Sequence, residues 1–400
     1  MVQQKMEKRY SLRFVIALVL LTSALSCLIL SLLFLWRINT TPDRSDGSND
    51  FSELLNIIAT RYIGAHDIEE VSNTAMRAAV DSLDDRWSFF MTPEEYVSYQ
   101  ASSDNRYTGI GVEVVIDEEI GGIKVMWVYP DSGAEAAGIV IGDIITGVDG
   151  ESIRGFSLPE VRALLRRPID DTVLLTVLRV SGAYENLTVV YSVIFTDPVS
   201  YEMIADTIGY VSVRNFESGA GDGFINAVNT LIEQGAQSFI YDVRSNNGGK
   251  VTEMTQILDF LLPEGEIFIS VDRSGEEQIT TSDANYLDLP AVVLVNSNSY
   301  SAAEYFTAIL SEYEYALTVG EQTTGKNRMQ NTIALPGGGA VHISTGEYLT
   351  KNRVSLYDAG GFTPDYIIPL SDEEHALYRS GELDLRLDPQ IKKSLSLLEE

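Results

Sequence analysis

The sequence predicts an α/β domain with a largely parallel sheet, preceded by a small, partly open β-barrel, a helical region and one transmembrane helix. Three observations lead to this prediction. Residues 14–36 are apolar and uncharged, residues 107–195 consist of short β-rich runs separated by glycine turns, and residues 197–370 alternate between strand-like and helix-like segments. Alternation of the last kind is typical of domains built on a parallel sheet. A length of 400 residues is typical of two or three domains.

The apolar run 14–36 is long enough to cross a bilayer, which takes about 20 residues. The preceding segment contains four basic residues, Lys5, Lys8, Arg9 and Arg13, and one acidic residue, Glu7. Positive flanks stay in the cytoplasm. No convincing cleavage site follows the run, so we expect a cytoplasmic tail (1–13), an uncleaved signal anchor (14–36) and a polar linker (37–50), with the rest of the chain outside the cell membrane.

Four further regions follow the linker. Residues 51–100 show helical spacing, and the sequence Thr-Pro-Glu-Glu from Thr92 to Glu95 predicts a helix start. Residues 101–195 form the β-rich domain, with one helix predicted to begin at Ser157. Residues 196–370 form the α/β domain, and residues 371–400 form an amphipathic helical tail.

Composition excludes several classes of function. The net charge is −30, from 28 basic and 58 acidic residues, so we expect no nucleic-acid binding, because phosphate contacts require Lys and Arg. The single cysteine, Cys27, excludes intrachain disulfides and multi-cysteine zinc sites. His66, His342 and His375 show no metal-ligand spacing, and no cofactor is expected.

A strand-like segment that ends at Val295 runs through a turn of small residues into a helix that starts at Ser301. A nucleophile at this place gains from the positive end of the helix dipole, and the N–H of Ala302 is free to bind an oxyanion. The alternative is a capping box, in which Ser301 only caps the helix and Glu304 is its partner.

The glycine-punctuated turn 320–327 contains Lys326. A lysine can replace histidine as a general base when burial lowers its pKa. Gln330, four residues later, points to the same face of a strand and is suited to orient the amine. A phosphate-binding P-loop is excluded because Asn327 follows the lysine. In the segment 241–249, a strand ends in Asn-Asn-Gly-Gly, which is either a tight loop or a source of oxyanion donors at the sheet edge.

Together these segments, SYSAAE (299–304), GEQTTGKN (320–327) and YDVRSNNGG (241–249), resemble the carboxy-terminal processing (tail-specific) serine peptidases of the S41 type. The resemblance implies that Ser301 is the nucleophile, Lys326 the base and Gln330 its orienting partner. It also implies an oxyanion site made by the backbone of Ala302 and of Gly249 or Gly248.

The resemblance covers residues 51–370. The segments LDDRWSFFMTPEEY (83–96), YTGIGV (107–112), GIVIGDII (138–145) and GFTPD (361–365) look like further parts of the family. They imply a crotonase/ClpP-like core with an inserted PDZ-like domain that binds the free C-terminal carboxylate of protein or peptide substrates. The resemblance also implies that the carboxylate binds the backbone of Gly109, Ile110, Gly111 and Val112. It further implies that Arg166 couples tail binding to activation of the peptidase core.

The sequence departs from the family pattern near the site. Tyr300 stands where the family has a small residue, and Asn327 replaces a glycine. No catalytic atom is lost, but the cleft is expected to be narrower or reshaped. The expected function is a membrane-anchored, extracytoplasmic endopeptidase. A catalytically silent PDZ scaffold and an enoyl-CoA-handling enzyme are the alternatives, and a homo-oligomer is left open.

Overall fold

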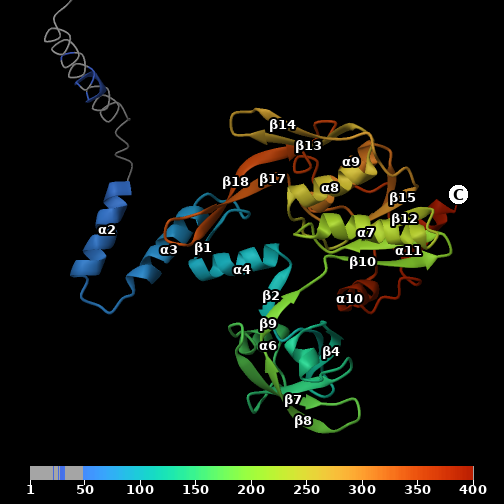
Figure 1. The fold of residues 1–400 in the computed structure, drawn as a ribbon, viewed down its shortest axis with the longest axis horizontal. Helices are drawn as coiled ribbons and strands as arrows, with labels where there is room; N and C mark the ends of the chain where they lie inside the picture. Colours follow the sequence, from blue (N-terminus) through green and yellow to red (C-terminus); the bar gives the residue numbers. More distant parts are fainter. Residues whose placement is uncertain (1–20, 22–25, 27, 32–47, 400) are drawn as a thin grey trace, which may run out of the picture. The chain divides into compact units, whose positions relative to one another are not determined.

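The computed structural model describes residues 21, 26, 28–31 and 48–399, in two units, Met1–Met76 and Arg77–Glu400 (Figure 1). The first unit contains helix α2 (Ser48–Arg61), and helix α3 (Ile68–Asp81) runs from the first unit into the second. Most of the expected signal anchor, residues 14–36, lies outside the described residues. Within the described part, no helix combines the length and the apolar character needed to cross a membrane.

The small β domain of the second unit is built on a sheet with the strand order β3-β4-β5-β7-β8, and β6 pairs with β5. A separate antiparallel pair, β2 and β9, carries the chain into and out of this domain. The strands are β2 (Arg106–Gly109), β3 (Val112–Asp117), β4 (Gly122–Val128), β5 (Ile144–Val148), β6 (Glu151–Ser152), β7 (Thr172–Leu178), β8 (Tyr184–Val190) and β9 (Ser192–Phe195), and the helices are α5 (Gly133–Ala136) and α6 (Leu158–Leu164). In this sheet β3 is an edge strand, paired only with β4.

The α/β domain is organised around a six-stranded sheet with the order β10-β11-β12-β15-β16-β19, in which all neighbours from β11 onward are parallel. Every residue of β12 and β15 is buried, as expected for parallel strands covered on both faces. The elements are β10 (Val199–Ala205), β11 (Ile208–Val213), β12 (Ser238–Asp242), β15 (Ala291–Val295), β16 (Ala316–Gly320), β19 (Tyr366–Ile367), α7 (Ala220–Glu233), α8 (Val251–Leu261) and α9 (Ala302–Glu312).

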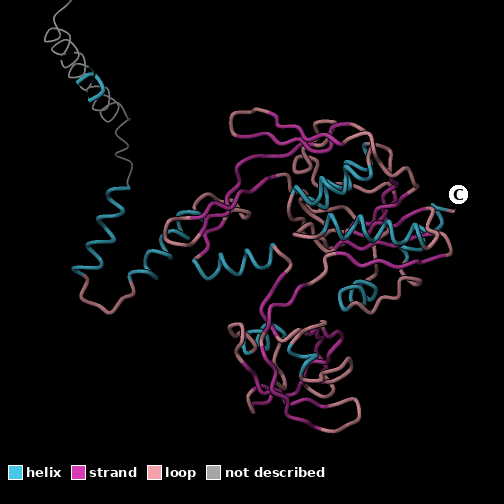
Figure 2. Tube along the Cα trace, in the orientation of Figure 1, coloured by secondary structure: helices cyan, strands magenta, loops and turns pink. Residues whose placement is uncertain are grey.

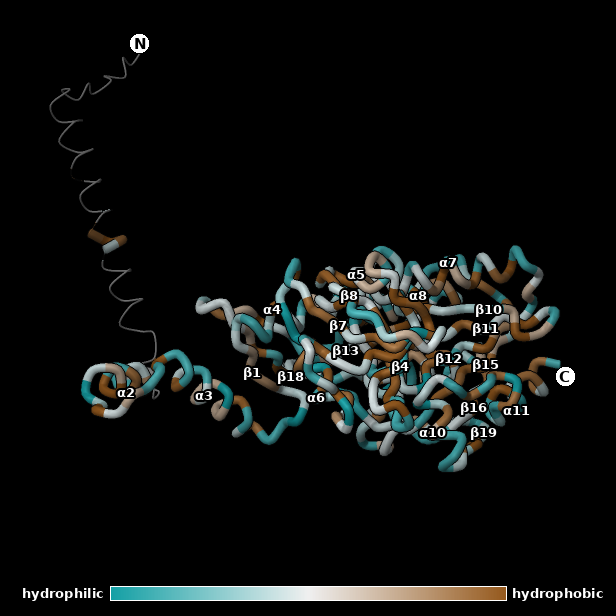
Figure 3. The backbone as a smooth tube through the Cα atoms, turned by 90° about the horizontal axis from the view of Figure 1, so that it is seen from below, coloured by the Kyte–Doolittle hydropathy of each residue, from teal (hydrophilic) through white to brown (hydrophobic). Residues whose placement is uncertain are grey.

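Two hydrophobic cores lie on the two faces of this sheet. Helices α7, α8 and α9 pack on one face with Tyr241 and Val293, whereas Ile391 of the C-terminal segment packs on the other with Ile240 and Val292. The hydropathy colouring shows brown, apolar chain where β12 and β15 lie (Figure 3). The C-terminal segment forms α10 (Asp372–Ser380) and α11 (Pro389–Leu398). The expected α/β domain with a largely parallel sheet is therefore present.

A second, antiparallel sheet was not anticipated from the sequence. Its order is β1-β18-β13-β14, with β17 also paired to β18. Figure 2 shows the strands of the chain in magenta. The strands are β1 (Phe89–Met91), β13 (Gly265–Asp272), β14 (Glu277–Ser282), β17 (Arg328–Ala334) and β18 (Ala340–Leu349). Strand β1 lies inside the range 51–100, which was expected to be helical. The sequence did not reveal this strand because its pairing partner, β18, is remote in sequence and local periodicity does not report such pairing. The predicted helix starts at Thr92 and Ser157 are confirmed by α4 (Pro93–Ser103) and α6.

Candidate active site

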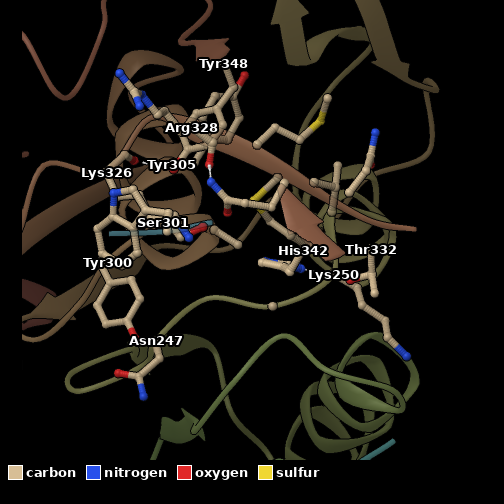
Figure 4. Close-up of a pocket in the computed structure, with 18 of the residues that line it drawn as sticks. Asn247, Lys250, Tyr300, Ser301, Tyr305, Lys326, Arg328, Thr332, His342 and Tyr348 are labelled. Atoms are coloured by element: carbon tan, nitrogen blue, oxygen red, sulfur yellow. Dashed lines mark hydrogen bonds between the residues drawn. The ribbon is translucent and has the colours of Figure 1, made fainter. Parts of the chain in front are cut away.

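Ser301, Lys326 and Gln330 line one cavity of about 640 Å³ in the second unit. In the close-up, Ser301 and Lys326 lie on the same side of the pocket, and Thr332 lies on the opposite side (Figure 4). Gly249 and Ala302 line the same cavity. The fold therefore gathers at one place the segments that follow β12, β15 and β16, whose carboxyl ends meet at one edge of the parallel sheet.

Ser301 joins strand β15 to helix α9 with a strained backbone. It is the N-cap residue of α9, as the capping alternative requires, but its φ is 59° and its ψ is −124°. An ordinary N-cap residue has extended backbone, and a positive φ at a residue with a side chain costs about 1–3 kcal/mol and concentrates at functional sites. Capping alone therefore does not explain this geometry. The sharp strand-to-helix turn is of the kind that exposes a nucleophile.

Glu304 connects the serine to the lysine turn. Its side chain is fully buried, and its Oε2 atom accepts the backbone N–H of Ser301 at 3.0 Å and that of Lys326 at 2.9 Å. The Oε1 atom accepts the backbone N–H of Gly325 and the hydroxyl of Thr323, both at 2.5 Å. A buried carboxylate is stable only when its oxygens are well paired. This one fixes the backbone of Lys326 relative to that of Ser301.

Burial lowers the pKa of the Lys326 amine from 10.5 to about 8, and nearby Asp85 partly opposes this shift. The side chain lies among aromatic rings. Its Nζ atom is 4.3 Å from the centroid of the Trp87 ring and 5.9 Å from that of Tyr300. The guanidinium of Arg86 lies 4.1 Å from the centroid of the same Trp87 ring. The amine thus meets the sequence-based requirement of a lowered pKa, and the rings favour its protonated form by cation–π attraction.

Gln330 lies on β17 and is tied to a polar network. Its Nε2 atom donates to the hydroxyl of Ser344 and to the carbonyl of Arg328, both at 3.0 Å. Ser344 in turn donates to Asp85 at 2.7 Å. Within residues 48–399, no hydrogen bond joins Gln330 to Lys326, so the expected orienting contact stays a prediction.

The oxyanion candidates differ in the use of their N–H groups. The N–H of Gly248 donates to Oδ1 of Asn246 at 2.8 Å. In contrast, the N–H groups of Gly249 and Ala302 donate to no acceptor among the described residues. A Cβ atom built on Gly248 would lie 2.8 Å from Cβ of Ser301 and 3.0 Å from the nitrogen of Ala302. The glycine loop and the start of α9 are therefore in contact, and Gly249 and Ala302 hold the free donors.

A second cavity, of about 670 Å³, lies along the edge strand β3 of the small β domain. Its wall includes all four residues expected to bind a C-terminal carboxylate: Gly109, Ile110, Gly111 and Val112. Gly111 has a φ of +86°, and an added Cβ would lie 2.2 Å from Cβ of Ser132. Arg166 lines the same cavity and is exposed. Among residues 48–399 it forms no ion pair, so its expected coupling role stays a prediction.

Comparisons with known proteins agree with this arrangement. The model of peptidase family S41 matches residues 207–368, and a PDZ domain model matches residues 124–179. A carboxyl-terminal-processing protease of Picosynechococcus sp. is 30% identical over 322 residues, which cover 79% of this chain and 76% of that protein. The chain belongs to the carboxyl-terminal-processing protease family. It is a serine-type peptidase with a PDZ domain, as the resemblance implied.

Two further comparisons give a second sequence relative and a solved structure with the same fold. A carboxyl-terminal-processing protease of Synechocystis sp. is 29% identical over 335 residues, covering 82% of this chain and 77% of the relative. A solved structure from Bacteroides fragilis, assigned to the S41 proteases, has a TM-score of 0.57 at 20% identity and covers 84% of this chain and 92% of that one. The second comparison shows the shared fold.

The sequence did not identify four residues that surround Ser301 and Lys326 in this processing protease: Asp85, Trp87, Glu304 as a bridge, and Tyr348. The hydroxyl of Tyr348 donates to the carbonyl of Lys326, and Tyr348 lines the same cavity as Ser301. Asp85 and Trp87 lie in the segment 83–96, and the resemblance of that segment to the family was the one sequence signal that could have pointed to them. Their contacts with residues far along the chain had no local signature.

His342 also lines the cavity, beside Thr332. Burial and the nearby Lys326 lower the pKa of its ring to about 4. Its Nδ1 atom is paired with the hydroxyl of Thr332 at 2.8 Å. A histidine with so low a pKa is a weak base. No group of three or more His, Cys, Asp or Glu side chains in the described part of the chain is arranged to hold a metal ion.

Proposed function

We propose that the chain is a membrane-anchored, extracytoplasmic endopeptidase that captures substrate C-termini with its PDZ domain and cleaves with Ser301 and Lys326. The observation that carries this proposal is the shared Glu304 carboxylate, which holds the backbone of Ser301 and of Lys326 at 3.0 and 2.9 Å from one oxygen atom. A bridge of this kind supports a working pair, because a nucleophile and its base must keep a fixed relation through acylation and deacylation.

Lys326 acts as the general base in this mechanism. With a pKa of about 8, a substantial fraction of the amine is neutral near pH 8 and able to accept a proton from the Ser301 hydroxyl. The amine lies against the ring of Trp87, and within residues 48–399 no hydrogen bond joins it to the Ser301 hydroxyl. Proton transfer therefore requires the lysine side chain to move toward Ser301. A bound peptide that excludes water from the cavity would favour this change, since desolvation stabilises the neutral amine. The protonated amine then returns its proton to the leaving nitrogen.

The oxyanion of the tetrahedral intermediate would be bound by the N–H groups of Gly249 and Ala302. Both groups donate to no other described residue, and that of Ala302 lies at the positive end of helix α9. Donors of this kind act on the charge that develops in the transition state, and removing one typically lowers the rate by about 10²–10³-fold. Gly248 serves the site by its small size rather than as a donor, because its N–H is already paired with Asn246.

The PDZ domain would bind the substrate tail at the open edge of β3. The free carboxylate meets the loop from Gly109 to Val112, and the last residues of the substrate add a strand beside β3. Helix α6 ends at this groove, since Arg162, Leu165 and Arg166 line the cavity along with the loop. The positive charges of Arg162 and Arg166 suit a carboxylate ligand, and Arg166 is proposed to respond to its arrival.

Cleavage of an unfolded protein substrate by the purified full-length chain in detergent tests the peptidase centre. We expect Ser301→Ala and Lys326→Ala each to abolish cleavage while tail binding is kept. Substrates with an amidated C-terminus should be cut at least about tenfold more slowly, because the carboxylate contacts are lost. Equal cleavage of free and amidated substrates would remove tail capture from the mechanism. Tail binding without any cleavage by the native chain would favour the scaffold alternative, and turnover of a CoA thioester alone would favour the enoyl-CoA alternative.

Membrane anchoring is proposed from the apolar run 14–36 and its basic N-terminal flank. The full chain is expected to remain in the membrane fraction after extraction with alkaline carbonate, whereas a chain lacking residues 1–47 is released. Protease added to the outside of intact cells should reach the peptidase domain. Release of the full chain by carbonate, or protection of the domain in intact cells, would contradict the proposed topology.

A further inference from the structure

The C-terminal segment of the chain reaches the loop that carries Gly249, one of the two proposed oxyanion donors. Arg244 lies in this loop, between β12 and Gly248, and is 5% exposed. Its Nη1 atom donates to Oδ2 of Asp388 at 2.6 Å and to Oε1 of Gln390 at 2.8 Å. Its Nε atom donates to Asp242 at 3.0 Å. The guanidinium is thus shared between the strand that precedes the loop and a segment more than one hundred residues away.

The residues of the C-terminal segment that contact Arg244 are themselves buried. Asp388 is 1% exposed and Gln390 is fully buried. A third residue of the segment, Tyr378, donates its hydroxyl to the carbonyl of Arg244 at 3.1 Å, and the Arg244 guanidinium lies 4.8 Å from the centroid of its ring. All three residues lie beyond residue 368, where the match to the S41 family model ends. They belong to a part of this chain to which that match assigns no role.

Because Arg244 and Asp388 are buried, the loss of either charge would leave the other without this partner and without water to replace it. A guanidinium away from water needs opposite charge and hydrogen-bond acceptors for its five N–H donors. Asp242 and Asp388 supply the two carboxylates, and Gln390 adds a neutral acceptor. Removing the charge of one carboxylate from such a pair leaves the arginine partly unsatisfied, so the side chain and the backbone attached to it are expected to shift.

The loop after Arg244 passes such a shift to the site. Ser245 has a φ of 55°, Gly248 of 89° and Gly249 of 145°, all in the left-handed half of conformational space. Glycine adopts such values freely, but the strained backbone of Ser245 persists only if surrounding contacts hold it. Asn246 provides one tie, since its Oδ1 atom accepts the N–H of Gly248 at 2.8 Å. Gly248 lies directly against Ser301.

We propose that Asp388, supported by Tyr378 and Gln390, is a positioning residue that holds the oxyanion loop in register with Ser301 through Arg244. The inference rests on the proposed Ser301 centre for its catalytic meaning. The C-terminal helices are then part of the active-site scaffold. Tail binding at the PDZ domain does not depend on them.

The test compares Asp388→Asn with Ser371→Ala in the full-length chain. Asparagine retains an oxygen that caps α11, a role in which Oδ1 of Asp388 accepts the N–H of Gln390 at 2.8 Å. It replaces the charged partner of Arg244 by a neutral group. Ser371→Ala removes the corresponding cap of α10, in the same C-terminal segment, where Ser371 accepts the N–H of Glu374 at 3.3 Å and does not contact Arg244.

We expect Asp388→Asn to lower kcat about 10- to 100-fold, somewhat less than deletion of an oxyanion donor, with KM unchanged within about twofold. Affinity for a peptide boronate, which forms a tetrahedral adduct with the serine, should fall in parallel, because such an adduct depends on the oxyanion donors. Ser371→Ala should leave both quantities unchanged. If Asp388→Asn does not fold, Tyr378→Phe removes one contact to the loop and should lower kcat about two- to fivefold with KM retained.

Hydrogen exchange followed by mass spectrometry supplies a readout that is independent of activity. In Asp388→Asn, peptides covering residues 241–249 should exchange faster, while peptides from β3 and α6 keep the wild-type rate. Wild-type kcat in both Asp388→Asn and Tyr378→Phe, with unchanged exchange in the loop, would overturn the inference. A wild-type chain without peptidase activity would instead refute the proposed function, and the exchange experiment would still decide whether the C-terminal segment holds the loop.

Discussion

Ser301 and Lys326 donate their backbone N–H groups to the same oxygen atom, Oε2 of Glu304, at 3.0 and 2.9 Å. The two residues come from different elements, since Ser301 starts helix α9 and Lys326 follows strand β16. Their relation is therefore set by a third residue that is itself fully buried.

Glu304→Gln is expected to impair the catalytic pair. An amide has one acceptor oxygen where the carboxylate has two, and its NH₂ group would face N–H and O–H donors, so at least one buried donor loses its partner. We expect kcat/KM to fall about 100-fold or more and the free energy of unfolding to fall by about 1–3 kcal/mol. Kinetics and thermal unfolding provide the measurements.

Glu312→Gln is the matched control for this prediction. Glu312 lies on the same helix and accepts two hydrogen bonds, from Thr350 at 2.5 Å and from the backbone of Asn352 at 3.0 Å, where Glu304 accepts four. It has no contact with the lysine turn, so a loss of stability without a comparable loss of kcat is expected. Equal kinetic losses in the two variants would show that the bridge at Glu304 has no special part in catalysis.

The pH dependence of cleavage should report the lysine. Since the neutral amine is the base and its pKa is lowered to about 8, kcat/KM is expected to rise with pH and reach half its maximum near pH 8. Trp87→Leu keeps the site apolar but removes the π system that favours the ammonium form. Cation–π attraction of about 0.5–1 kcal/mol corresponds to a downward shift of the midpoint by about half a pH unit.

Trp127→Leu serves as the control for the pH profile, because Trp127 is half exposed on β4 of the PDZ domain. Its profile should overlap that of the wild type. Trp87→Phe, which retains an aromatic ring, should lie between the wild type and Trp87→Leu. An upward shift of the midpoint in Trp87→Leu would mean that Trp87 acts mainly by excluding water, and the cation–π interpretation would be wrong.

Lys326→Met is expected to stabilise the inactive protein. The unfolded chain binds the proton up to a pKa of about 10.5, whereas the folded chain releases it near 8. Stability of the wild type therefore rises between pH 8 and pH 10.5, and below pH 8 the folded protein carries the full penalty of a buried charge. Methionine removes this penalty, so the free energy of unfolding at pH 7 should increase by about 1–3 kcal/mol.

Denaturation at several pH values checks this expectation, and the gain from Lys326→Met should shrink as the pH is raised from 8 to 10.5. Lys250→Met is the control, since Lys250 lines the same cavity but its side chain is 35% exposed and paired with Asp104 at 3.3 Å. It should not stabilise the protein. A destabilised Lys326→Met variant at pH 7 would show that contacts of the ammonium outweigh its desolvation.

Gly111→Ala should weaken tail binding. A Cβ at this position would collide with Ser132 at 2.2 Å, and the φ of +86° disfavours any side chain, so the carboxylate-binding loop must move. We expect the Kd for a peptide with a free C-terminus, measured by fluorescence anisotropy, to rise about tenfold or more. Gly150→Ala is the control in the same domain, with a φ of +85° and no atom within 4 Å of the added Cβ. Similar affinities in the two variants would argue against this loop as the binding site.

Much of the local structure could be predicted from the sequence. The helix starts at Thr92 and Ser157 depend on contacts three residues apart, and the buried strand before Ser301 is visible as an apolar run. The parallel sheet followed from the alternation of such segments. By contrast, the antiparallel sheet was not predicted. Strand β18 pairs with β1 across about 250 residues, and the local sequence of either strand carries no pattern that identifies so distant a partner.

What the sequence by itself determined was the order of the elements and the identity of the chemical groups: a serine at a helix start, a lysine in a glycine turn and a glycine loop after a strand. Only the tertiary structure decided the state of those groups. The lowered pKa of Lys326 comes from burial beside Trp87 and Tyr300, and the bridge at Glu304 and the tie from Asp388 to Arg244 join segments that are distant in sequence. Desolvation and hydrogen bonding depend on neighbours in space, and a linear pattern does not contain them.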